Sequence, residues 1–68
     1  MNDVAKVIEV TCGSAAGIED AVQNGLNKVA KSVKGIKGAW LNDIKVVTDP
    51  VGKIQEWRVN MRVSFIVD

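Results

Sequence analysis

One segment near the end of the chain sorts its side chains by face. From Glu56 to Val67, apolar and polar side chains alternate. The apolar set is Trp57, Val59, Met61, Val63, Phe65 and Val67, and the other set is Glu56, Arg58, Asn60, Arg62, Ser64 and Ile66. A period of two places these sets on opposite faces of a sheet, so one face meets a core and the other stays polar. A strand of this kind spans about 40 Å, which is long for so small a protein and predicts that it lies against other surfaces.

The length of the chain limits its core. Its 68 residues predict a single domain over residues 1–68. Chains below roughly 70–80 residues usually need disulfides, a metal or self-association to hold their fold. Cys12 is the only cysteine and histidine is absent, so no intrachain disulfide can form and zinc lacks its usual ligands. Self-association is therefore the favoured source of extra stability.

Charge and hydropathy narrow the class of partner. Nine basic residues against eight acidic ones give a net charge of +1. This balance argues against nucleic acid or an anionic membrane as a partner. The polar start, Met1-Asn2-Asp3, does not resemble a signal peptide, and no window approaches the length of an apolar membrane span. We therefore expect a cytoplasmic protein.

The first half of the chain predicts a strand followed by a helix. Residues from Val4 to Thr11 are rich in β-branched side chains and end before Gly13. From Ser14 the apolar period changes to about 3.6, which predicts a helix from about Ala15 to Lys34. Ser14 is the expected N-cap, and Gly35 or Gly38 would supply a left-handed stop. The apolar stripe consists of Ile18, Val22, Leu26, Val29, Val33 and Ile36.

The second half predicts two strands joined by a turn. Residues 39–48 are β-rich, Asp49-Pro50-Val51-Gly52 has turn chemistry, and the long strand runs from about Lys53 to Val67. The order is thus β-α-β-β, in which the first strand reaches the second by a crossover and the last pair is antiparallel. The predicted fold class is α+β, with one helix on the apolar face of a three-stranded antiparallel sheet.

Several segments in this order resemble the dodecin family. They are the strand Lys6-Val7-Ile8-Glu9-Val10, a Gly-Ser turn, the helical Asp20-Ala21-Val22-Gln23-Asn24-Gly25-Leu26, a tryptophan-bearing strand, and the closing Arg58-Val59-Asn60-Met61-Arg62-Val63-Ser64-Phe65. The resemblance covers nearly the whole chain. It implies a protomer whose sheet wraps around its helix, and twelve such protomers assembled into a hollow sphere.

The resemblance also implies a ligand. Flavin-binding dodecins hold flavins, such as FMN or riboflavin, in pairs where protomers meet. Each ring stacks on a tryptophan of the second strand, and a glutamine of the third strand hydrogen-bonds the pyrimidine edge. The implied role is storage and protection of flavin, and no reaction is catalysed.

Carried over residue by residue, the resemblance gives a candidate flavin site. Trp40 would be the aromatic platform, although counting from the helix end places the family position nearer Gly38. Arg58 stands where the glutamine is expected, and a guanidinium can only donate hydrogen bonds. Asn60 and Asn42 complete the candidate set. The alternatives are that Trp40 fills a subunit interface, and that the shell holds no flavin and is a structural assembly or binds ions or small molecules.

Other polar residues admit two interpretations each. Arg58 and Arg62 could bind phosphate or carbonyl oxygens, or form intersubunit ion pairs with Glu9, Asp43 or Glu56. Asp43 with Asn42, or Asp49, could offer oxygen atoms to a cation, but no EF-hand spacing exists and we predict no metal site.

Two further predictions concern the core and the class of protein. Trp57 is predicted to pack in the core, because its i+2 neighbours are apolar. Without a histidine, an activated cysteine or paired carboxylates, the chain is not predicted to be an enzyme.

Overall fold

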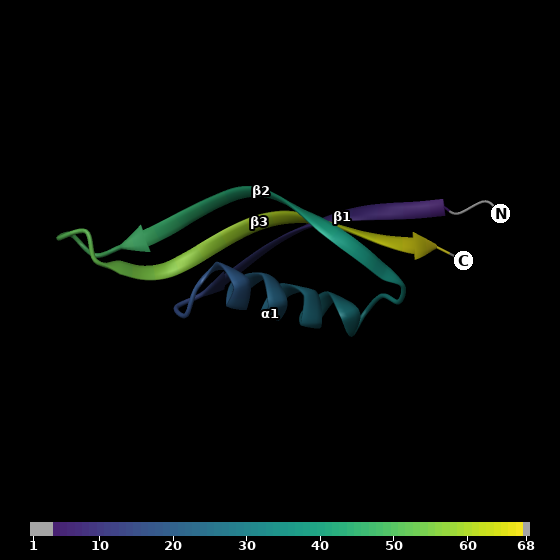
Figure 1. The fold of residues 1–68 in the computed structure, drawn as a ribbon, viewed down its shortest axis with the longest axis horizontal. Helices are drawn as coiled ribbons and strands as arrows, with labels where there is room; N and C mark the ends of the chain where they lie inside the picture. The colour runs from purple at the N-terminus through teal and green to yellow at the C-terminus, as the bar shows by residue number, and fades with distance from the viewer. Residues whose placement is uncertain (1–3, 68) are drawn as a thin grey trace.

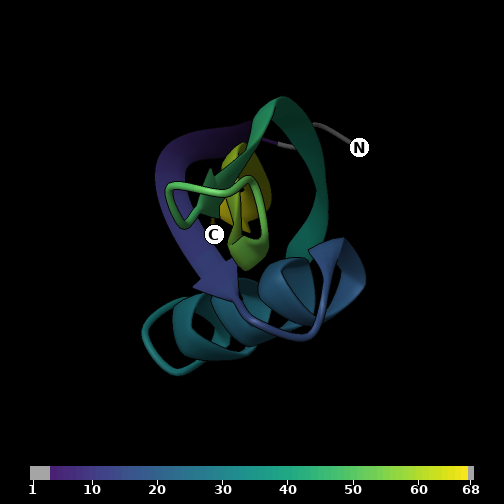
Figure 2. The same ribbon diagram turned by 90° about the vertical axis from the view of Figure 1, so that its left-hand side faces the viewer.

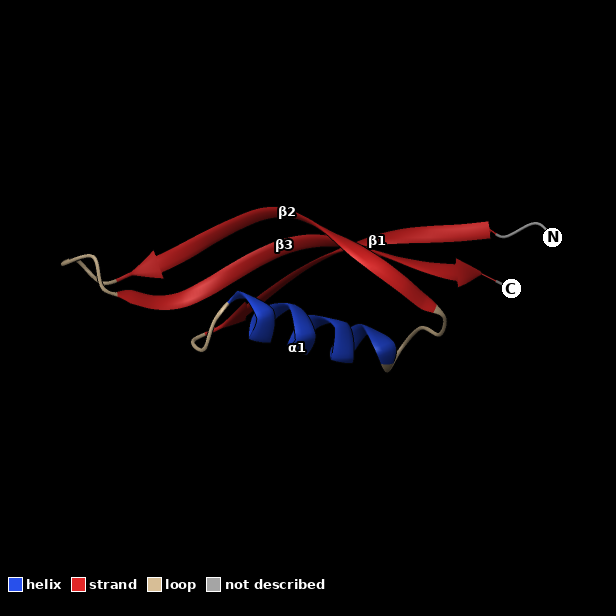
Figure 3. Ribbon diagram, in the orientation of Figure 1, coloured by secondary structure: helices blue, strands red, loops and turns tan. Residues whose placement is uncertain are grey.

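The described part of the chain, residues 4–67, forms one helix and three strands. They are described by a computed structural model, and the prediction made for Met1-Asn2-Asp3 lies outside these residues. Figures 1 and 3 show the elements in the predicted β-α-β-β order. They are β1 (Val4–Ser14), α1 (Ile18–Ala30), β2 (Ile36–Thr48) and β3 (Ile54–Val67). Within the described part of the chain, no helix is long and apolar enough to cross a membrane.

The alternating strand, β3, lies in the middle of the sheet. The strand order is β1-β3-β2, and β3 is antiparallel to both neighbours. Figure 2 shows the sheet curving over α1, which packs mainly on β1 and β3. β3 therefore contacts a strand on each edge and a helix on one face, which accounts for its length.

The core lies between α1 and β3. Val59, Met61 and Val63 are fully buried, and Ala21 and Val29 of α1 pack against them. This confirms the predicted apolar face of β3. The helix lies close to the strand at Gly25, where a Cβ atom would lie only 2.8 Å from the Met61 Cε atom.

Trp57 differs from its prediction. It shares the helix-facing side of β3 but is only half-buried and does not belong to the core cluster. The reason is that β2 and β3 continue beyond the helix (Figure 1), so the sheet has more apolar face than one helix can cover. Its neighbour Val46 and the nearby Ile44 are likewise exposed on this face.

The helix begins later than predicted. Ser14 is not its N-cap, because it pairs with Trp57 and so extends β1. The cap is Gly17, whose carbonyl oxygen accepts the Ala21 N–H at 3.0 Å. The Ser14 hydroxyl oxygen instead accepts the N–H of Ala16 at 2.9 Å and stabilises the turn before the helix.

The helix also ends earlier, at Ala30 instead of near Lys34. The next residues form a turn that reaches Gly35, which has a left-handed φ of 75° but lies beyond the end of the helix. The helix itself ends at a right-handed cap, Lys31, so Gly35 is not the predicted stop. Val33 and Ile36 still pack on the core, but from the turn and from β2. Because these two residues continue the helical spacing of apolar side chains, the predicted helix is longer than the observed one.

The predicted hairpin turn between β2 and β3 is confirmed. The Asp49 carboxylate accepts the N–H of Val51 at 3.0 Å and that of Lys53 at 2.9 Å. Gly52 has a φ of 88°, a conformation that glycine adopts most easily. The Asp49 side chain thus accepts hydrogen bonds from two backbone N–H groups of the turn.

Asp49→Ala removes the acceptor for both N–H groups. We expect it to lower the free energy of unfolding by about 1 kcal/mol, because water replaces each bond only in part. Urea denaturation at a fixed protein concentration measures the change. Asp49→Asn keeps one side-chain oxygen and should retain most of the stability, so equal losses in the two variants would contradict this role.

Cys12 lies on the helix-facing side of β1. Its thiol donates to the Val59 carbonyl oxygen at 3.6 Å. Burial raises the pKa of the Cys12 thiol above its ordinary value, and the Arg58 charge opposes this rise only in part. The thiol is therefore protonated at neutral pH and is a poor nucleophile.

The raised pKa predicts a pH-dependent reactivity. The alkylation rate of Cys12 by iodoacetamide should rise with a midpoint above pH 9.0 in the folded protein, and near that value in urea. Since the folded pKa exceeds the unfolded one, this thiol's contribution to stability is complete below the unfolded pKa. It is lost as pH rises through the folded pKa. A folded-state midpoint at or below pH 9.0 would show that burial does not control this thiol.

Candidate functional site

The candidate site lies on the sheet face away from α1. Residues on this face form rows across the three strands, because directly paired residues share a face. Arg62 of β3 pairs with Glu9 of β1 and Trp40 of β2. One row along, Asn60 pairs with Thr11 and Asp43, and in the next row Arg58 pairs with Gly13 and Lys45.

Trp40 is the most exposed aromatic platform on this face. Its exposed fraction is 60%, and a shallow hollow forms beside it. Val7, Leu41, Asn42 and Arg62 line this hollow with Trp40. The structure thus brings together two of the predicted site residues, Trp40 and Asn42, next to the cationic Arg62.

A β-bulge shapes this part of β2. Leu41 pairs with Met61, but the next pair joins Asp43 with Asn60, so Asn42 is an extra residue. The bulge shifts the alternation by one residue. Asp43 consequently lies on the polar face, and Ile44 joins Val59 on the side of the helix.

A second hollow, of about 380 Å³, contains the other polar candidates. Arg58 and Asn60 line it together with Thr11, Asp43 and Lys45. This Asn60 hollow therefore has two cations and one anion. The predicted site residues fall into two neighbouring hollows, with Trp40 in one and Arg58 and Asn60 in the other.

Arg58 makes an ion pair within its own strand. Its Nη1 atom lies 3.1 Å from the Glu56 Oε1 atom, and both side chains are partly exposed. Glu56 is one of the partners predicted for Arg58, but the pair forms within one protomer and not between subunits as predicted. A pair this exposed contributes at most about 1 kcal/mol, so its role is to hold the guanidinium in place.

Asn60 has a buried oxygen atom without a donor. Its Oδ1 atom is inaccessible to solvent, and no group in the described chain donates to it. Leaving such an acceptor unpaired costs about 1–3 kcal/mol. The atom is therefore a candidate for pairing with a ligand or with another subunit.

Gly38 lies on the same face as Trp40 but offers no side chain. The Ser64 hydroxyl donates to its carbonyl oxygen at 3.3 Å, and a Cβ atom at Gly38 would meet nothing within 4 Å. Gly38 therefore leaves open space one alternation away from the indole. A flat ring that covers Trp40 can extend over it.

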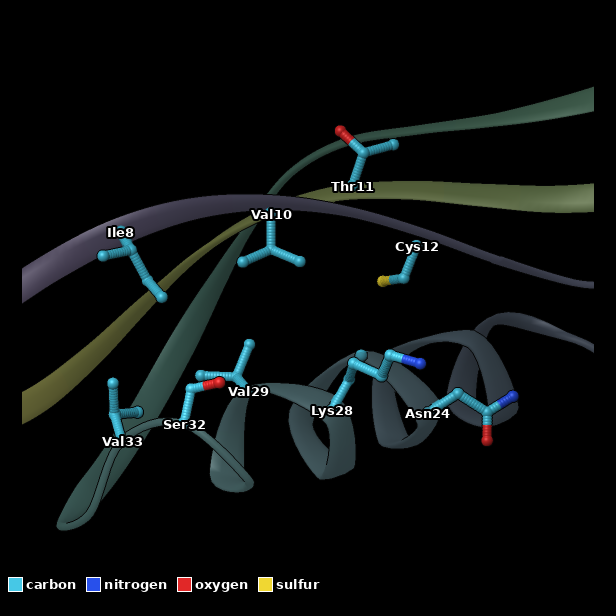
Figure 4. Close-up of a pocket in the computed structure, with 10 residues that line it drawn as sticks. Ile8, Val10, Thr11, Cys12, Asn24, Lys28, Val29, Ser32 and Val33 are labelled. Carbon is cyan, nitrogen blue, oxygen red and sulfur yellow. The ribbon is translucent and has the colours of Figure 1, made fainter.

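A third hollow is apolar and lies on the opposite side of the sheet. Figure 4 shows this groove between β1 and α1, with Ile8, Val10 and Cys12 pointing toward the helix. Val29 and Val33 close it from the helix side, and Lys28 and Asn24 lie along its rim. Thr11 points away from the groove, toward the polar face.

The structure gathers no metal cluster from the residues it describes. Within residues 4–67, no three acidic, cysteine or histidine side chains come together as ion ligands. The Asp49 carboxylate is already engaged by backbone N–H groups of its turn. Asp43 lies beside Lys45 and Arg58, whose charges compete with a cation.

The sequence did not identify several of the residues that line these hollows. Val7 lies beside the Trp40 hollow, and Thr11 and Lys45 line the Asn60 hollow. Their places depend on the register of β1 and β2 against β3, which the alternation alone does not define. A prediction of the bulge at Asn42 would have been needed to place Lys45.

Comparison with known proteins supports the fold. No curated protein matches the sequence. Among solved structures, dodecin from Streptomyces davaonensis has a TM-score of 0.91 at 24% identity, over 100% of this chain and 98% of its own. A dodecin variant from Thermus thermophilus has a TM-score of 0.90 at 24% identity, over 98% of each chain.

A third similar structure is the calcium dodecin of Mycobacterium tuberculosis, a calcium-chelating antigen with a novel calcium-binding site. Its TM-score is 0.81 at 29% identity, over 96% of this chain and 91% of its own. The family model for dodecin matches residues 4–68. The chain therefore belongs to the dodecin family.

Proposed function

We propose that the protein assembles into a homododecamer and stores a flavin, FMN or riboflavin, at its subunit junctions. Family membership supports a small-ligand-binding assembly. The observation that carries the flavin proposal is Trp40, an indole with 60% of its surface exposed on the sheet face away from α1. An aromatic side chain so exposed offers a stacking surface to a flat heteroaromatic ring.

The residues around Trp40 suit a flavin. The open space at Gly38 leaves room for a ring wider than the indole. Arg62, in the same row as Trp40, can donate to carbonyl or phosphate oxygens. Asn42 adds an amide with both a donor and an acceptor. The bound flavin would supply visible absorption and fluorescence. Stacking on the indole would quench the fluorescence.

The surface area of the protomer supports assembly. A folded monomer of 7.3 kDa exposes about 4,200 Å², whereas this chain exposes 5005 Å². The excess, about 800 Å², is what one partner typically buries in a stable interface. The radius of gyration, 14.1 Å against about 11 Å for a compact chain of this length, supports the same conclusion.

The apolar surfaces indicate where other copies would pack. The apolar groove between β1 and α1 is open, and so is the helix-facing side of β2 at Leu41, Ile44 and Val46. A patch this large on a small chain favours burial against another protein surface. Copies of the same chain would supply the core that one protomer lacks.

The proposed role of the protein is to bind a ligand and not to catalyse a reaction. The one cysteine, Cys12, has a raised pKa and packs against the core, so its thiol is not an activated nucleophile. The candidate residues are donors, acceptors and an aromatic platform. The cytoplasmic location stays a prediction.

A second candidate function is a shell without flavin. Arg58 favours it, because this guanidinium already pairs with Glu56 and cannot accept a hydrogen bond. The calcium-chelating relative adds an ion as a possible cargo of such a shell. A yellow preparation, or flavin release on denaturation, would reject this candidate.

Trp40→Ala tests the flavin proposal. Riboflavin or FMN fluorescence should be quenched by the wild-type protein at micromolar concentration, and the variant should bind roughly 5- to 100-fold more weakly. This corresponds to about 1–3 kcal/mol of lost stacking. Fluorescence titration measures both affinities.

Trp57→Phe is the matched control for this titration. It changes the other tryptophan, which lies on the opposite sheet face, and should leave the quenching unchanged. Wild-type protein that does not quench either flavin would reject the proposal. Equal quenching by Trp40→Ala would show that the ring binds elsewhere.

Light scattering tests the assembly. At micromolar concentration we expect the mass of twelve protomers of 7.3 kDa each. The physical reason for assembly is that one protomer exposes more surface than a compact chain of its mass, and other copies would bury it. A monomer mass would contradict both candidate functions, and a smaller closed oligomer would contradict the dodecamer.

A further inference from the structure

We propose that neighbouring copies of this chain join head to tail, with the end of the β2–β3 hairpin of one copy lying in the apolar groove between β1 and α1 of the next. The inference rests on the proposed assembly and deepens it, because it names the two surfaces that meet. Both surfaces lie on the helix-facing side of the sheet. The flavin candidates lie on the other side, so this contact is separate from the candidate site.

The helix covers less than half of the length of the molecule. The described chain is 54 Å long, whereas a helix of 13 residues is about 20 Å long. α1 packs mainly on β1 and β3, while β2 and β3 continue beyond it to their turn (Figure 1). We call residues 44–57 the hairpin arm. The helix-facing side of this arm is left without a helix of its own chain.

The helix-facing side of the hairpin arm is apolar and open. Ile44 and Val46 have exposed fractions of 47% and 39%, and Trp57, which pairs with Val46, is only half-buried. Large apolar side chains gathered on the surface of so small a protein favour burial against another protein surface. Aromatic side chains are frequent anchors of such contacts. A seat in a neighbouring copy would make Trp57 a core residue of the assembly, although it is not one in the protomer.

The groove offers a matching concave surface. It has a volume of about 420 Å³ and apolar walls, which Ile8 and Val10 form from β1 and Val29 and Val33 form from the helix side (Figure 4). Lys28, the charged residue of its lining, lies along the rim. The groove therefore has room for bulky apolar side chains and buries no charge beneath them.

A chain cannot place its own arm in its own groove. The groove lies between β1 and the second half of α1. Trp57 pairs with Ser14, where β1 ends, and the arm continues from there away from the helix (Figure 1). β2 and β3 stay paired along the arm, so folding it back would break these pairs. An arm that fills the groove must therefore come from another copy.

The contact is head to tail because the two surfaces are different. A two-fold contact between two arms would leave both grooves open. A head-to-tail contact uses the arm and the groove of every copy, and such contacts close into rings when the rotation between copies allows it. The excess surface of the protomer, about 800 Å², is of the size that one partner buries in a typical contact.

Disulfide trapping tests which surfaces meet. Cys12 lines the groove and is the only cysteine of the chain, so a second thiol on the arm can report their contact. Ile44→Cys and Val46→Cys place this thiol on the helix-facing side of the arm, and Val47→Cys places it on the other side as the control. The assembled variants are oxidised with glutathione disulfide at alkaline pH, since only a thiolate reacts. Glutathione disulfide takes up the two electrons and protons of each new bond.

We expect links between Cys12 and the new thiol of another copy in Ile44→Cys or Val46→Cys, and none in Val47→Cys. Each copy then has one reacting thiol on each surface, so head-to-tail links give a ladder of masses above two protomers on a non-reducing gel. Mass spectrometry of tryptic peptides identifies the linked positions. Links between two new thiols, or the absence of a link to Cys12 from both positions, would overturn the inference.

Val46→Lys and Val47→Lys test whether this contact supports assembly. Both side chains have an exposed fraction of 39% in the protomer but lie on opposite sides of the arm, so both variants should fold, which circular dichroism checks. Val46→Lys would bring an ammonium group to an apolar groove with Lys28 at its rim, which is unfavourable. Light scattering should then give a mass below twelve protomers, whereas Val47→Lys should keep the wild-type mass. Equal masses for the two variants would contradict the contact.

The experiments separate this inference from the function on which it rests. If the wild type assembles but Cys12 is not linked to the arm, assembly stands and the head-to-tail contact fails. If the wild type is a monomer, the proposed assembly fails and the inference with it. Neither result depends on a bound flavin. Trp57→Phe keeps an aromatic ring in the contact and should assemble as the wild type does.

Discussion

The structure depends on one strand having two different faces while it is paired along both edges. β3 gives its apolar side to α1 and its polar side to the candidate site, and its backbone groups bond to β1 and β2. Burial of Val59, Met61 and Val63 fixes which side faces the helix, since a slip of one residue would expose all three. The same constraint directs Arg58, Asn60 and Arg62 away from the core.

Because the helix is short, one protomer alone leaves part of its apolar sheet face uncovered. α1 covers β1 and β3 but leaves much of β2 and the end of the hairpin without an apolar partner. A longer helix would have buried Ile44 and Val46 within the chain. The protomer exposes about 800 Å² more surface than a compact chain of its mass, which is about what one partner buries in a typical interface. Stability of the fold and assembly are therefore linked, and protein concentration should affect both.

The sequence predicted the elements, their order and the core face, because periods of two and 3.6 are local properties of the chain. It did not predict the end of the helix. Val33 and Ile36 continue the helical spacing, yet they reach the core from a turn and from β2. Nor did it divide the candidate site into two hollows, because pairing register and the bulge at Asn42 depend on contacts between distant segments.

That bulge links the core to the candidate site. In a regular strand Asp43 would point toward the helix side opposite Val59, and Ile44 would lie on the polar face. The extra residue reverses both, so that Ile44 lies on the helix-facing side next to Val59 while Asp43 joins Asn60 in the hollow. The bulge thus decides which residues of β2 share the polar face with Trp40. Since side chains on the two faces share one backbone register, the packing of the core determines which polar groups a ligand meets.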